Sequence, residues 1–146
     1  MATQLLPLSP PPFDQNMYSG GAMSTSWRTW FSQLWTYAKG PFTSVTAGNA
    51  QGVMNTTYFA DDVGTVSITL PTSFNVGDEF RVVGVGAGGW EILQNTGQTI
   101  HSPTGSTTTS TGTISSTNRY DGVTLVGIVK DSDLSVMYSV GTLTFS

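Results

Sequence analysis

The sequence predicts a mainly β protein in which an N-terminal extended arm and one amphipathic helix precede an antiparallel β-barrel or sandwich domain. Apolar and polar residues alternate with a period of two in residues 65–70, and again at Leu134, Val136, Tyr138 and Val140. This alternation is typical of strands with one buried face. Gly, Asn and Asp recur between the runs, where turns are needed. Short strands at this spacing indicate a sandwich or a barrel.

Three segments follow from these patterns. Residues 1–24 are rich in proline and glycine and have no apolar period, residues 25–39 have a helical period, and residues 40–146 have the strand period. Consecutive prolines at 10–12 favour an extended arm, because each proline fixes φ and removes a backbone donor. The chain is therefore expected to contain an arm, a helix and a β domain.

The helix of residues 25–39 has a strongly aromatic face. Ser24, Thr25 or Ser26 can cap its start, and Gly40-Pro41 ends it. Each tryptophan has on the order of 200 Å² to bury, so we expect the face to be covered. Two arrangements satisfy this expectation: contact between subunits of a homotrimer, or packing on the chain's own β domain. The predicted oligomer interface consists of Trp27, Trp30, Phe31, Leu34 and Trp35.

The arm carries more apolar side chains than a solvated linker needs. These are Leu5, Leu6, Leu8 and Phe13. A disordered tail is one interpretation, but tails that never bind are usually more polar. We therefore expect this arm to anchor the chain to another protein.

Composition excludes several classes of function. Five Lys and Arg against nine Asp and Glu leave a net charge of −4, so no basic surface is available for nucleic acid. The absence of cysteine excludes disulfides and thiolate metal sites. No apolar run approaches the ~20 residues that span a bilayer, so membrane insertion is not expected. We expect no cofactor and no metal.

No motif indicates catalysis. His101 is the only histidine, so a Ser/His/Asp arrangement would depend wholly on it. Gly84, Gly86 and Gly89 have the spacing of a dinucleotide fingerprint, but a strand rather than a helix is expected after them. The acidic pairs at 61–62 and 78–79 lie in expected turns, where carboxylates cap backbone groups. We therefore predict no catalytic residues and no enzyme activity.

Residues 102–118 are rich in Ser, Thr and Gly, with Ile114 as the one large apolar side chain. This composition predicts a solvent-facing loop or hairpin outside the packed core. Its hydroxyl groups, together with an aromatic side chain nearby, form a candidate ligand surface of Thr107, Thr108, Thr109 and Tyr120.

Several stretches resemble small virion structural proteins of tailed bacteriophages, of the head fibre, capsid decoration or short tail-fibre knob kind. The stretches are LLPLSP at 5–10, WRTWFSQLW at 27–35, VGDEFRV at 76–82, GGWEI at 88–92, QNTGQTI at 94–100 and TNRYD at 117–121. The resemblance implies a homotrimer in the virion, assembled in the bacterial cytoplasm, with the arm as a virion anchor and the β domain as an outward knob.

Two functions are compatible with this resemblance. The first is a head fibre or decoration subunit that adheres to other virion proteins of the capsid or tail. The alternative is a tail-associated receptor-binding or adaptor protein that recognises a host surface glycan during host attachment. The long repetitive shaft found in many fibre proteins is missing from this sequence, which favours a short fibre or knob close to the particle.

Overall fold

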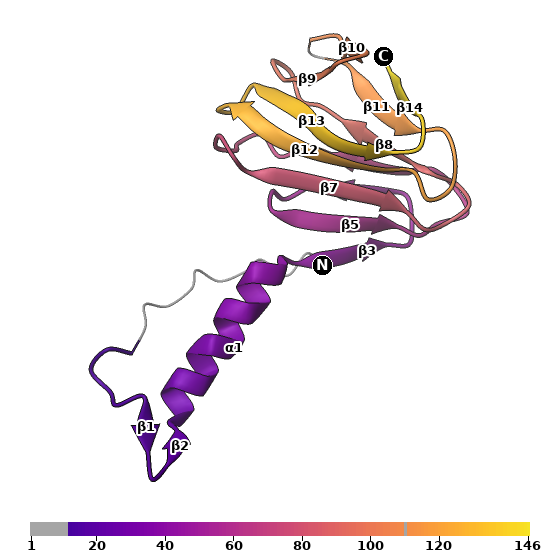
Figure 1. The fold of residues 1–146 in the computed structure, drawn as a ribbon. Coiled ribbons are helices and arrows are strands. Elements are labelled where there is room, and N and C mark those ends of the chain that lie inside the picture. Colours follow the sequence, from indigo (N-terminus) through magenta and orange to yellow (C-terminus); the bar gives the residue numbers. More distant parts are fainter. Residues whose placement is uncertain (1–11, 110) are drawn as a thin grey trace. The chain divides into compact units, whose positions relative to one another are not determined.

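The computed structural model describes residues 12–109 and 111–146, and it confirms a mainly β chain with a sandwich. The chain divides into two units, Met1–Pro41 and Phe42–Ser146. Figure 1 shows the helix of the first unit and the layered strands of the second. Leu5, Leu6 and Leu8 lie outside the described residues.

The described part of the first unit is a short hairpin followed by the helix. Strands β1 (Tyr18–Ser19) and β2 (Ala22–Met23) pair antiparallel. Gly20 and Gly21 connect them with φ of 61° and 81°, a conformation that glycine adopts readily. Of the predicted extended arm, residues 18–23 are therefore folded back into a hairpin, because two adjacent glycines allow a tight reversal.

Helix α1 (Thr25–Lys39) occupies the segment that the apolar period predicts. The Ser24 carbonyl accepts the backbone N–H of Arg28 at 3.0 Å, which begins the helix. Gly40 has a φ of 69°, the left-handed conformation that commonly ends helices.

The second unit is a β-sandwich of two sheets, called here the seven-stranded and the five-stranded sheet. The seven-stranded sheet has the order β10-β9-β13-β12-β7-β5-β3, and the five-stranded sheet has the order β14-β11-β8-β6-β4. The strands of the first are β3 (Phe42–Val45), β5 (Thr56–Ala60), β7 (Glu79–Gly84), β9 (Thr99–Ser102), β10 (Gly105–Ser106), β12 (Gly122–Val129) and β13 (Asp133–Val140). Those of the second are β4 (Asn49–Gln51), β6 (Val66–Thr69), β8 (Trp90–Leu93), β11 (Thr113–Ser116) and β14 (Leu143–Phe145).

The sheets are mixed, so the antiparallel expectation is wrong for the first half of the domain and for the parallel pair β9–β13. From β3 to β8 the chain alternates between the two sheets, and β3, β5 and β7 pair parallel, as do β4, β6 and β8. A strand that returns after a visit to the opposite sheet runs in the same direction as its predecessor. The period-two pattern records only which face is buried and carries no information on a neighbour's direction.

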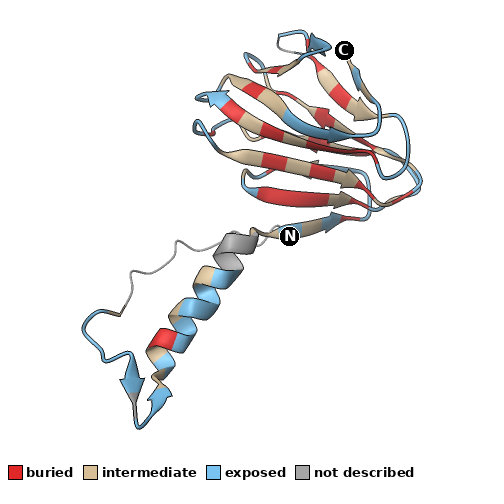
Figure 2. Cartoon of the chain, viewed as in Figure 1, coloured by how far each residue is buried: buried red, intermediate tan, exposed pale blue. Residues whose placement is uncertain are grey.

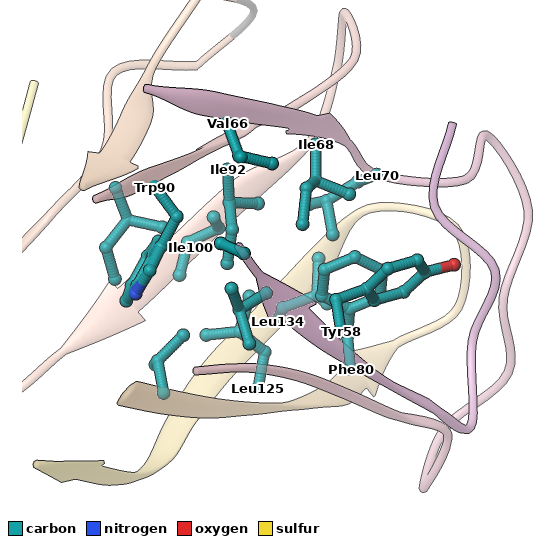
Figure 3. Close-up of a cluster of buried hydrophobic side chains, with 14 of the residues drawn as sticks. Tyr58, Val66, Ile68, Leu70, Phe80, Trp90, Ile92, Ile100, Leu125 and Leu134 are labelled. Carbon is teal, nitrogen blue, oxygen red and sulfur yellow. The ribbon is translucent and has the colours of Figure 1, made fainter. Parts of the chain in front are cut away.

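The core lies between the sheets. Figure 3 shows Val66, Ile68, Leu70 and Ile92 of one sheet facing Tyr58, Phe80, Leu125 and Leu134 of the other. Two aromatic side chains in this core place their polar atoms on backbone groups. The Val53 N–H donates to the Tyr58 hydroxyl at 2.7 Å, and Trp90 Nε1 donates to the Asp121 carbonyl at 2.9 Å. Burial raises the pKa of Tyr58 and keeps its hydroxyl neutral.

Gly86, one of the three glycines with the spacing of a dinucleotide fingerprint, and the nearby Gly88 allow close backbone packing. Strand β8 follows them, and no helix does. A Cβ on Gly86 would lie 2.1 Å from the Asp62 carbonyl oxygen, and one on Gly88 would lie 2.0 Å from the Gly64 carbonyl oxygen. Only glycine lets the β7–β8 connection lie this close to the β5–β6 connection.

The expectation for residues 102–118 is wrong in one respect. Ile114 is fully buried in β11, an interior strand that pairs with β8 and β14. Thr107 is also buried, and its hydroxyl accepts the Ile100 N–H at 2.8 Å. The Ser/Thr-rich composition does not reveal this strand in the sequence, because Ile114 is the one side chain that β11 contributes fully to the core.

Candidate functional site

A polar network on strands β9, β10 and β13 contains the only histidine. The pairing register sets His101 opposite Ser106 on one side and opposite Ser135 on the other. His101 Nδ1 lies 3.0 Å from Ser106 Oγ, and His101 Nε2 lies 2.8 Å from Asp133 Oδ1. The Ser132 hydroxyl donates to the second Asp133 oxygen at 2.6 Å. Ser132 and His101 together lower the pKa of Asp133.

This network has the residue types of a hydrolytic triad, but the backbone donor next to its serine is engaged elsewhere. In a serine hydrolase, backbone N–H groups near the nucleophile stabilise the oxyanion. The N–H of Thr107, which follows Ser106, donates instead to the Ile100 carbonyl at 3.0 Å. Ser106 is exposed, and His101 and Asp133 are partly exposed, so water screens their interaction. We therefore interpret the network as a clip that ties the β9–β10 hairpin to β13.

Asp62 and Asp78 cap backbone groups, as the sequence predicts, whereas Glu79 is the first residue of β7 and pairs with Arg81. Asp62 accepts the N–H of Val63 at 2.6 Å and that of Gly48 at 3.3 Å. Asp78 accepts the Asn75 N–H at 2.8 Å. Among the described residues, no cluster of His, Asp and Glu has the arrangement of a metal site. These carboxylates stabilise turns.

The residues of the candidate ligand surface are not brought together. Thr107 is buried and must be removed from that surface, whereas Thr108 and Thr109 are exposed before the start of β11. Tyr120 lies beyond the other end of β11, exposed and in the left-handed conformation with a φ of 70°. The Arg119 guanidinium lies 4.7 Å from the centre of its ring.

The side chains of the aromatic helix face differ in exposure. Trp27 is buried: its Nε1 donates to the Gln15 carbonyl at 3.0 Å, and Phe13 contacts its ring edge. Phe13, predicted as part of the virion anchor, therefore contacts the helix, while most of its side chain remains exposed. Trp30 and Leu34 are half-buried, while Phe31 is 40% and Trp35 is 65% exposed. Trp27, predicted for the oligomer interface, is covered by its own chain because residues 12–17 fold back onto the start of the helix.

The outer face of the seven-stranded sheet carries apolar side chains that sequence reasoning missed. Tyr138 and Val140 are 74% and 69% exposed, and Figure 2 shows the end of β13 in the exposed colour. Their alternation with Leu134 and Val136 suggested one common buried face. A register shift in the β12–β13 pairing separates them, because Leu125 pairs with Val136 and Thr124 pairs with Tyr138. The bulge turns the second half of the strand over.

Two rows of paired residues describe this face. One row is Phe42, Thr57, Arg81, Thr124 and Tyr138, and the next is Ser44, Phe59, Val83, Gly122 and Val140. Phe42 and Phe59 stack with ring centres 5.7 Å apart. A hollow of about 150 Å³ lies at Gly122 and is bordered by Arg81, Tyr138 and Val140.

The outer face of the five-stranded sheet is polar at the corresponding positions. Its central row consists of Asn49, Ser67, Glu91, Ser115 and Thr144. The Ser67 hydroxyl donates to Glu91 at 2.5 Å. The two faces of one sandwich therefore differ in chemistry: polar side chains line this face, and apolar side chains are exposed on the seven-stranded face.

The sequence matches no protein-family model and no curated protein. In the described part of the chain, no helix has the length and apolar character needed to cross a membrane.

Proposed function

We propose that this chain is a structural subunit of a tailed-bacteriophage virion, a homotrimeric head fibre or capsid decoration protein. Residues before the helix anchor it to other virion proteins, the aromatic helix joins the subunits, and the sandwich is the projecting knob. The virion assignment is supported by the resemblance of the stretches at 5–10, 27–35, 76–82, 88–92, 94–100 and 117–121 to such proteins. Adhesion through buried area is its mechanism, with no chemical step.

The observation that carries the proposal is the exposure of Phe31 and Trp35 on α1. Trp35 is 65% exposed, so roughly 130 Å² of an indole meets water, which corresponds to about 3 kcal/mol at the usual area coefficient. The helix is 15 residues long, and isolated helices of this length are marginal in water. Sharing the aromatic face among three copies around an axis covers it and stabilises the helix.

Oligomeric state tests the subunit contact. The natural chain is expected to sediment as a trimer at micromolar concentration, and Phe31→Asp with Trp35→Asp is expected to lose the trimer. Thr29→Asp with Gln33→Asp, two exposed polar positions on the same helix, is the matched control and should remain trimeric. A monomeric natural chain contradicts the homotrimer.

Copy number in purified virions tests the location. Quantitative mass spectrometry is expected to find many copies, as for a protein repeated over the shell. A chain lacking residues 1–11 should fold but fail to join the particle. Full incorporation of this shortened chain would refute the anchor.

A second function is favoured by Tyr120, an exposed aromatic ring held on a turn next to Arg119. An aromatic face with a neighbouring cation fits the apolar face and the hydroxyl groups of a sugar. In this alternative the chain is a tail-associated receptor-binding or adaptor protein. Tyr120→Asn keeps a residue type that tolerates positive φ, so adsorption to host glycan should fall with no change in melting temperature. Unchanged adsorption rejects this function.

A further inference from the structure

We propose that the outer face of the seven-stranded sheet packs against the same face of other copies of this chain. This contact is separate from the helix contact and does not depend on it. The face is defined by the two rows that run from Phe42 to Tyr138 and from Ser44 to Val140.

The apolar character of this face is the first argument. Phe42, Tyr138 and Val140 are 58%, 74% and 69% exposed. These three side chains alone expose on the order of 350 Å², in the range of the largest apolar patches on monomeric proteins. With the half-buried neighbours Phe59 and Val83 the apolar side chains supply about half of the ~800 Å² that each partner contributes to a stable interface, and the polar side chains of the same rows add to it.

The shape of the face is the second argument, because it holds both a projection and a recess. Gly122 has no side chain, and a hollow of about 150 Å³ remains between Val83, Tyr138 and Val140. Phe42 lies on the edge strand of the same sheet, where its ring stacks on Phe59 and remains 58% exposed. An aromatic ring of this size fits such a hollow, so the exposed ring of one copy can enter the recess of the next.

Charge is the third argument, and it favours a second copy over a charged partner. Arg81 of the first row forms an ion pair with Glu79, which lies beside that row, two residues earlier in β7. Two identical surfaces repel each other when they carry net charge, and this pair removes that repulsion. An apolar surface with complementary shape features and no net charge favours association with an identical surface on another copy.

Cross-linking tests the contact directly. The chain contains no cysteine, so one engineered thiol reports one position. Thr124→Cys lies in the middle of the proposed interface, and Ser115→Cys lies in the middle of the opposite, polar face. A short bismaleimide is expected to link Thr124→Cys chains into covalent dimers on a denaturing gel, while Ser115→Cys chains stay monomeric. Equal cross-linking of the two, or none at Thr124→Cys, overturns the proposal.

Dissociation provides the second measurement. Val140→Lys places a charge on the apolar face, and Thr144→Lys places one on the polar face as the matched control. Val140→Lys is expected to raise the concentration of half-dissociation at least tenfold, with the control unchanged and both variants folded by circular dichroism.

The helix variant separates this proposal from the one above. Loss of assembly in the helix variant with full assembly in Val140→Lys rejects the sheet contact and leaves the proposed function standing. The reverse result rejects the helix contact and supports the sheet contact. A natural chain that is monomeric in solution overturns both the sheet contact and the helix contact.

Discussion

Replacing Ile114 with alanine tests whether the Ser/Thr-rich segment belongs to the core. The side chain is fully buried in β11, where Ile114 pairs with Ile92 of β8 and Phe145 of β14. Truncation of a buried isoleucine to alanine costs about 2–5 kcal/mol, since transfer free energy is lost and a cavity is left. Because β11 is flanked by strands on both sides, the site cannot easily collapse, and we expect about 3 kcal/mol or more. For a unit of this size that lowers the melting temperature by about 10–20 °C.

Urea unfolding followed by circular dichroism is the assay. Ser115→Ala is the matched control, because Ser115 is the next residue of the same strand and points to the outer face. We expect its free energy of unfolding to stay within about 0.5 kcal/mol of the natural chain. If Ile114→Ala were no more destabilising than Ser115→Ala, β11 would not be an interior strand and the burial argument would fail.

Three other outcomes are expected. Gly88→Ala should destabilise the sandwich by several kcal/mol, since its Cβ would meet the Gly64 backbone at 2.0 Å, whereas Gly105→Ala, with open space around it, should be nearly neutral in the same urea titration. Asp131 has a lowered pKa because the Phe74 N–H and the Ser73 hydroxyl donate to it, so its contribution to stability is present above about pH 4 and lost as the pH falls through the lower folded value. Asn tolerates the φ of 61° at this position, so Asp131→Asn removes the charge without straining the backbone. Urea titrations between pH 2 and 5 should then show a smaller loss of unfolding free energy for Asp131→Asn than for the natural chain. Finally, Ser106→Ala should leave the hydrolysis of a nitrophenyl acetate ester at the rate of the natural chain; a large fall would make the His101 network catalytic.

The candidate site was only partly predictable from the sequence. The aromatic helix face was identified from its period, but the covering of Trp27 by Phe13 and Gln15 depends on a chain reversal that no periodicity signals. The Ser106, His101 and Asp133 network joins residues on three strands, and their contact depends on pairing register. One signal in the sequence was available for the apolar sheet face: Val136, Met137 and Tyr138 form a continuous apolar run, which a bulge explains better than strict alternation does.

Local properties of the chain determined the division into a helix and strands, the turn glycines and acidic caps, and the absence of thiol chemistry. Each of these depends on residue type and on spacing over a few positions, which a sequence displays directly. The tertiary structure alone decided that β3, β5 and β7 pair parallel in one sheet and β4, β6 and β8 in the other. It also decided the burial of Ile114 and Thr107 and the exposure of Tyr138 and Val140. Strand direction and register arise from contacts between segments far apart in the chain. A shift of one residue in such a pairing exchanges the buried face for the exposed one, whatever the local pattern is.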